Sequence, residues 1–187
     1  MDKSIIVFGT IFAAFIAGVF SYFNLINSKE QKVSEFRQSW INDFRKELAA
    51  LVASVFYLAY YYSNTIEPKA SDVEESHRLY VAACTGLLTR INAKDPDIPT
   101  KHLNSTFLTN LNELQNAFNL QDYNKVKILA NFLVKSSSPL LKAEWERVKR
   151  GEESYRRTKI YAGLVCAVGL IVISIFLNAY TTMASST

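Results

Sequence analysis

The chain has 187 residues, a net charge of +4 and 20% charged residues, which is typical of an ordinary soluble domain when averaged over its length. The charges are segregated, however, because residues 4–28 and 160–187 contain no Asp, Glu, Lys or Arg. The two cysteines, Cys84 and Cys166, exclude a disulfide-stapled fold and fit a reducing compartment.

The first uncharged segment predicts a transmembrane helix over residues 1–28. It is longer than the roughly 20 residues that a helix needs to cross the hydrocarbon core of a bilayer. A cleaved signal peptide is the alternative interpretation, but the apolar run is too long for one and has no small-x-small cleavage site before Asn24. We therefore expect this segment to remain as a membrane anchor.

Small residues recur at every fourth position of this first span and predict a face for helix packing. In lipid, small side chains let two helix backbones approach closely and pack by dispersion and weak hydrogen bonds. The partner is either the second span of the same chain or the first span of neighbouring copies, and a ring of such copies would surround a narrow path. The residues of this packing or pore-lining face are Gly9, Thr10, Ala13, Ala14, Ala17, Gly18, Ser21 and Asn24.

An aromatic and basic block at residues 32–45, KVSEFRQSWINDFR, follows the first span. It resembles a segment of small bacterial and phage-associated membrane proteins that mostly lack an assigned function. The resemblance implies a bacterial inner membrane, where some small two-span proteins are membrane-targeting effectors of anti-phage systems. Within the block, Phe36, Trp40 and Phe44 are spaced by four residues, and we expect them to pack in the helical domain together with Trp145.

Residues 29–159 are predicted to form a helical bundle, because their apolar residues recur in steps of three and four. The first helix carries a heptad seam from Ile41 to Tyr62 and ends before Pro68. Ser71 and Glu74 predict a capping box that opens a second helix. Residues 95–99, which contain two prolines, are expected to end it.

Three further helices are expected in the second half of the bundle. Apolar residues mark a third helix over residues 103–118 and a fourth over residues 126–133. Ser138 and Pro139 predict the start of a last helix, since serine is a preferred N-cap and proline a preferred first helical residue. That helix leads toward the second uncharged segment.

The second uncharged segment predicts another transmembrane helix over residues 160–187, with a short external tail. Of the 21 Lys and Arg residues, 20 lie between the two spans. This bias places the central domain in the cytoplasm and both termini in the periplasm. A basic collar facing anionic membrane lipids explains the net positive charge better than nucleic-acid binding does. The collar consists of Lys29, Lys32, Arg147, Lys149, Arg150, Arg156, Arg157 and Lys159.

The sequence offers little for catalysis. It has no metalloprotease, phosphate-loop or nucleophile-elbow motif, and its only histidines are His77 and His102. His77 and Cys84 fall on one helix face, but two ligands do not make a zinc site. We therefore expect no catalytic, cofactor-binding or metal-binding residues, and the chain is not expected to be an enzyme.

The predicted fold class is all-α, with two transmembrane helices flanking a cytoplasmic helical bundle. The leading functional hypothesis is an inner-membrane homo-oligomer that acts on membrane integrity, as a pore or depolarising effector controlled by its cytoplasmic domain. A role in anti-phage defence would fit the resemblance of residues 32–45. The alternative is a membrane-anchored scaffold or sensor adaptor that recruits a cytoplasmic protein partner.

Overall fold

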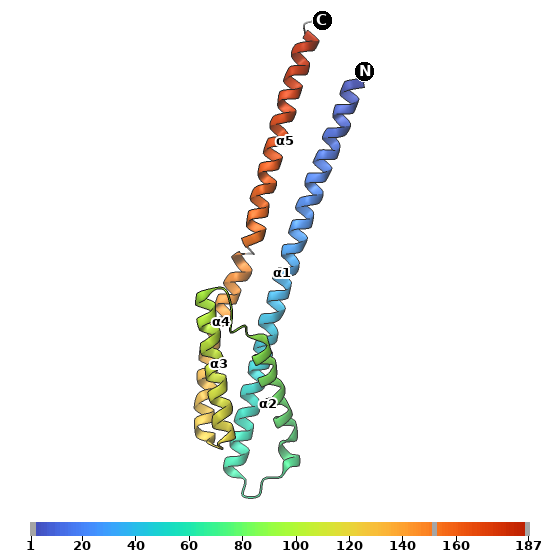
Figure 1. Cartoon of the computed structure of the whole chain (residues 1–187). Coiled ribbons are helices and arrows are strands. Elements are labelled where there is room, and N and C mark those ends of the chain that lie inside the picture. The colour runs from blue at the N-terminus through green and yellow to red at the C-terminus, as the bar shows by residue number, and fades with distance from the viewer. Residues whose placement is uncertain (1–2, 151–152, 186–187) are drawn as a thin grey trace. The chain divides into compact units, whose positions relative to one another are not determined.

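The computed structural model describes residues 3–150 and 153–185, and all regular structure in these ranges is helical (Figure 1). The helices are α1 (Lys3–Asn64), α2 (Ala70–Arg90), α3 (Ile98–Asn119), α4 (Tyr123–Arg150) and α5 (Glu153–Ser185). The predicted all-α fold is confirmed. The chain divides into two compact units, a bundle over residues 36–149 and a hairpin of α5 with α1 up to Glu35. The bundle is thus shorter at both ends than the predicted domain of residues 29–159.

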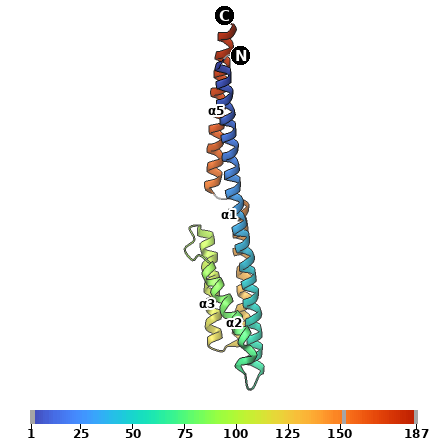
Figure 2. The same ribbon diagram turned by 90° about the vertical axis from the view of Figure 1, so that its right-hand side faces the viewer.

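The bundle consists of the C-terminal half of α1 together with α2, α3 and α4, which run alongside it (Figures 1 and 2). The heptad seam predicted on α1 lies in the core, where Phe44, Leu51 and Leu58 are fully buried. Burial of apolar surface supplies most of the stability of such helices, since short isolated helices are marginal in water. The other three helices contribute the fully buried side chains of Leu87, Phe107, Leu111, Leu114, Val126, Leu133 and Leu140.

Helix α4 differs from the prediction, because it runs without interruption from Tyr123 to Arg150 and contains Pro139 in its interior. A proline inside a helix removes a backbone hydrogen bond and costs about 3 kcal/mol. Core packing on both sides of the proline outweighs this local cost, since Leu133 and Leu140 are both fully buried. The expected helix start at the proline is therefore wrong.

The start of α2 also differs from the prediction. The N-cap position is occupied by Lys69, whose side chain makes no cap hydrogen bond, so Ser71 and Glu74 do not form a capping box there. Tyr61 of α1 holds this end of α2 instead. Its hydroxyl accepts a hydrogen bond from the Lys69 amide at 3.0 Å and donates one to Asp72 Oδ2 at 2.9 Å. Tyr61 is one of four tyrosines within residues 57–62, and its hydrogen bonds link α1 to α2.

The hairpin unit packs aromatic residues of α1 against one aromatic residue and one glycine of α5. The ring of Phe8 stacks on that of Phe176 with centroids 4.4 Å apart. A Cβ atom placed on Gly169 would overlap the ring of Phe15, so this glycine makes room for the aromatic side chain. Ala162 is also buried in this unit. The α1–α5 contact therefore uses the aromatic side of α1.

Two helices are long and apolar enough to cross a membrane. The most apolar window within Ile6–Asn64 has a mean hydropathy of 2.1, and that within Arg156–Thr182 has a mean hydropathy of 2.7. None of the window in Ile6–Asn64 is buried within the structure, and only 6% of the window in Arg156–Thr182 is. Helices this apolar are normally buried when they belong to the core of a soluble protein, so the exposure of both favours a membrane as their surroundings.

Candidate functional sites in the two units

Most of the predicted packing face of the first span lies on the side of α1 that points away from α5, whereas Ala14 and Gly18 border the groove between α1 and α5. Each helical residue advances by about 100° around the axis. Thr10, Ala17 and Ser21 therefore lie roughly opposite Phe8 and Phe15, which contact α5. Every residue of the predicted face is exposed in the hairpin, namely Gly9, Thr10, Ala13, Ala14, Ala17, Gly18, Ser21 and Asn24.

This placement bears on which helix the face would contact. In the described part of the chain, no side chain and no other helix comes within 4 Å of a Cβ placed on Gly9 or Gly18. Ala14 and Gly18 line one edge of an apolar groove of about 400 Å³ between α1 and α5, but they are not covered by α5. The second span of the same chain thus leaves most of this face open.

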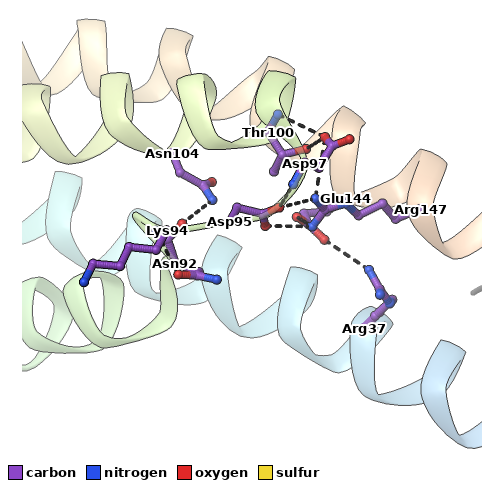
Figure 3. Close-up of polar contacts among 9 residues, drawn as sticks. All are labelled: Arg37, Asn92, Lys94, Asp95, Asp97, Thr100, Asn104, Glu144 and Arg147. Atoms are coloured by element: carbon purple, nitrogen blue, oxygen red, sulfur yellow. Dashed lines mark hydrogen bonds and ion pairs between the residues drawn. The ribbon is translucent and has the colours of Figure 1, made fainter.

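In the bundle, polar side chains from three segments converge at the loop between α2 and α3 (Figure 3). Asp95 lies in this loop, Asp97 caps the start of α3, Arg147 and Glu144 project from α4, and Arg37 projects from α1. The loop follows from the sequence, because Pro96 disfavours helix at the residue before it, and Asp97 with Pro99 marks the start of α3. We call these five residues the Arg147 network.

Arg147 is the centre of the network. Its guanidinium donates two hydrogen bonds to the Asp95 carboxylate, from Nη2 to Oδ1 at 2.6 Å and from Nη1 to Oδ2 at 2.9 Å. It also lies 3.0 Å from Glu144 Oε1 and 3.6 Å from Asp97 Oδ2. The Asp95 side chain is only 8% exposed and that of Arg147 20%. Two parallel bonds from one arginine fix both the position and the orientation of a carboxylate.

The acidic groups are also held by the backbone around them. The Asp97 amide donates to Asp95 Oδ1 at 2.9 Å, and Asp97 Oδ2 accepts from the Thr100 amide at 3.1 Å, which caps α3. Asn104 Nδ2 donates a hydrogen bond to the Asn92 carbonyl at 2.9 Å, which links the start of the α2–α3 loop to α3. The α2–α3 loop is therefore a rigid segment attached to α4 rather than an open connection.

The network shifts the pKa values of its two most enclosed carboxyl groups in opposite directions. The hydrogen bonds from Arg147 lower the pKa of Asp95, although burial opposes them. Burial raises the pKa of Glu144, although the charges of Arg147 and Arg37 oppose this effect. Glu144 lies 3.6 Å from the Arg37 guanidinium, so it bridges α4 and α1.

A second arginine links α1 to α2. Arg90 Nη2 donates to Glu47 Oε1 at 2.7 Å, and its Nη1 lies 3.6 Å from Asp43 Oδ2. Trp40 Nε1 donates to the Arg90 carbonyl at 3.2 Å. Gly86 leaves room for this contact, because a Cβ atom at that position would overlap the Glu47 carboxylate. Together with the Arg147 network, this cluster connects every helix of the bundle near the α2–α3 loop.

These clusters join the helices of the bundle to one another. Among the described residues there is no group of three His, Cys, Asp or Glu side chains that could hold a metal ion. Arg147 occupies the space between the three acids, where its charge would repel a cation. His77 and Cys84 serve separate contacts, since His77 Nε2 lies 2.9 Å from the Tyr62 hydroxyl and Cys84 is buried in the core.

The structure corrects part of the predicted basic collar and aromatic packing. The guanidinium of Arg147 is paired with Asp95 inside the bundle and is only partly exposed, whereas the other seven collar residues are exposed. Phe36 is 73% exposed and does not pack in the bundle. Residues at every fourth position of a helix do not form a straight row, because each is displaced by about 40° around the axis from the one before. The row that starts at the buried Phe44 has therefore left the core by Phe36.

The remaining aromatic residues of that prediction lie at different depths. Trp40 is partly buried and stacks on Phe44 with centroids 5.4 Å apart. Trp145 is 40% exposed, and the Lys149 ammonium lies 6.0 Å from its ring centroid. Only Phe44 is fully buried.

The sequence interpretation missed the Arg147 network, since it treated residues 95–99 only as a helix stop. One signal was available there. Asp97 followed by Pro99 is an N-cap pattern, and α3 does begin at Ile98 rather than near residue 103. The pairing of Asp95 with Arg147 spans 52 residues, and no local pattern predicts it.

The chain matches no family model, no curated protein and no solved structure. The geometry of the two units is therefore the basis for the function proposed below.

Proposed function

We propose that this chain is a two-pass protein of the bacterial inner membrane, with its bundle in the cytoplasm and both termini in the periplasm. The apolar and exposed windows of α1 and α5 support insertion. The position of 20 of the 21 Lys and Arg residues between the spans supports the orientation, because basic residues are retained on the cytoplasmic side.

We further infer that copies of the chain assemble through the exposed face of α1 and depolarise the membrane, as a pore or pore-like effector controlled by the bundle. The observation that carries this proposal is that every residue of the face is exposed and that Thr10, Ala17 and Ser21 point away from α5. In lipid, small side chains favour close helix contacts. The Ser21 hydroxyl and the Asn24 amide are exposed as well, and polar groups in spans usually face another helix or water.

The test is controlled expression in bacteria with a membrane-potential dye, combined with crosslinking in membranes. Wild type is expected to depolarise the cells and to give a ladder of crosslinked oligomers. Replacing Ala13 and Ala17 by leucine adds bulk to the contact face without reducing apolarity, so both signals should fall while insertion persists. Ala179→Leu is the control, because Ala179 is an exposed residue of α5 away from this face.

Two outcomes would contradict the proposal. One is an unchanged oligomer ladder in the Ala13→Leu, Ala17→Leu variant, which would show that this face does not drive assembly. The other is a normal membrane potential in cells that contain the wild-type protein at a level confirmed by immunoblot.

A second candidate function is a membrane-anchored adaptor that recruits a cytoplasmic protein. The observation that favours it is an open groove between α1 and α4 within the bundle, with a volume of about 610 Å³. Oligomers without depolarisation would support the adaptor over the pore.

A further inference from the structure

The groove between α1 and α4 has an apolar floor in an otherwise polar surface. Ile41 of α1 is 2% exposed and Leu141 of α4 is partly buried, and both line the groove. Val134 and Trp145 also line it, and both side chains remain substantially exposed. Together with Ile41 and Leu141, these two side chains give the groove an apolar lining.

The lining residues follow the spacing of two neighbouring helix faces. On α1 they lie at positions 38, 41, 42 and 45, and on α4 they extend from Val134 to Trp145 in steps of three and four. Eleven helical steps of about 1.5 Å give the groove a length of roughly 16 Å, or three turns of helix. An elongated channel between two helix ridges has the shape that receives a third helix.

The charged residues that line the groove have one sign. Arg45 and Lys142 line it and are exposed, and no acidic residue contributes to the lining. In the described ranges, neither of these two side chains forms an ion pair. The acids two residues away from them are Asp43, Glu47 and Glu144, and these pair with Arg90 and Arg147. The groove therefore presents unneutralised positive charge beside an apolar floor.

We propose that this groove binds an acidic amphipathic helix of a partner protein. The apolar side chains of that helix would cover Ile41, Leu141 and Trp145, and its carboxylates would lie beside Arg45 and Lys142. An exposed tryptophan at the wall of a pocket is a typical anchor for such a contact. The site lies in the bundle and does not involve the α1 face proposed for assembly, so either proposal can fail without the other.

The experiment uses the full-length chain in nanodiscs of neutral lipid and a fluorescent peptide of about 14 residues, matched to the length of the groove. The peptide has leucine at positions spaced by three and four and glutamate elsewhere. A second peptide with lysine in place of glutamate is the control for charge. Fluorescence anisotropy should show saturable binding of the acidic peptide only, with empty nanodiscs as the blank.

The variant Arg45→Glu, Lys142→Glu should weaken binding by at least about tenfold, because both attractive charges become repulsive. The control variant Lys101→Glu, Lys125→Glu carries the same change in net charge at exposed positions outside the lining, and it should bind as wild type does. Trp145→Ala should weaken binding by about tenfold through loss of the anchor.

Three results would overturn the proposal. The first is equal binding of the acidic and basic peptides, and the second is an equal loss of binding in the control variant. The third is binding of the chain to vesicles of anionic lipid through Arg45 and Lys142 without binding of the peptide, which would make the groove a membrane contact instead.

Discussion

Arg147→Met tests whether the Arg147 network holds the bundle together. The substitution keeps most of the apolar stem but removes the guanidinium, which leaves the nearly buried Asp95 carboxylate without its cation. Breaking a fully buried ion pair costs about 3–5 kcal/mol. Arg147 is partly exposed, and the Asp97 amide would still donate to Asp95, so we expect a loss of about 2–3 kcal/mol in the free energy of unfolding. In a domain of this size, that loss lowers Tm by roughly 6–15 °C.

The assay is thermal unfolding of the full chain in detergent, followed by circular dichroism at 222 nm. Arg78→Met is the control, because the Arg78–Glu75 pair also joins an arginine to a carboxylate, but its side chains are 69% and 65% exposed. An exposed pair of this kind contributes about 0.5 kcal/mol or less. Adding Asp95→Asn to Arg147→Met should recover part of the loss, since it removes the unpaired charge. Equal Tm values for the Arg147 and Arg78 variants would refute the structural role of the network.

Three further predictions follow from the same geometry. Because the folded pKa of Asp95 is lowered, its contribution to stability is present above its unfolded pKa and is lost as the pH falls through the folded value, so Tm should drop in acid less steeply in Asp95→Asn than in wild type. The folded pKa of Glu144 is raised, so this residue favours folding at low pH and opposes the effect of Asp95. Because both proteins contain Glu144, the difference in Tm between wild type and Asp95→Asn reports on Asp95. Gly169→Leu should open the α1–α5 hairpin and retard its migration in detergent gels, and adding Phe15→Ala should restore part of the compact form; an unchanged mobility would contradict the contact. Reporter fusions after Lys94 should read cytoplasmic and a fusion after Thr187 periplasmic, and the reverse pattern would invalidate the proposed orientation.

The elements that the sequence predicts well are those with a strong periodic pattern. The steps of three and four on α1 place Phe44, Leu51 and Leu58 on one face, and that face forms the core. The sequence likewise predicts that the two uncharged segments can span a bilayer, because length and apolarity alone decide whether a helix can cross one. Local pattern was misleading at Pro139, where burial of residues on both sides keeps the helix intact.

The candidate sites were less predictable because they depend on contacts between distant segments. The sequence places Arg147 in a basic collar, and only the fold brings it to Asp95, 52 residues away. The small residues of the first span were identified from their spacing, but spacing does not say which helix they face. That depends on the contact of Phe15 with Gly169, which turns Thr10, Ala17 and Ser21 away from α5.

The most direct test of the central claim uses purified protein reconstituted into vesicles that hold a potassium diffusion potential, monitored with a voltage-sensitive dye. Wild type should collapse the potential, and the Ala13→Leu, Ala17→Leu variant, inserted at equal density, should leave it intact because assembly through the α1 face is lost. The account would be contradicted if vesicles containing crosslinkable wild-type oligomers held their potential as well as empty vesicles do.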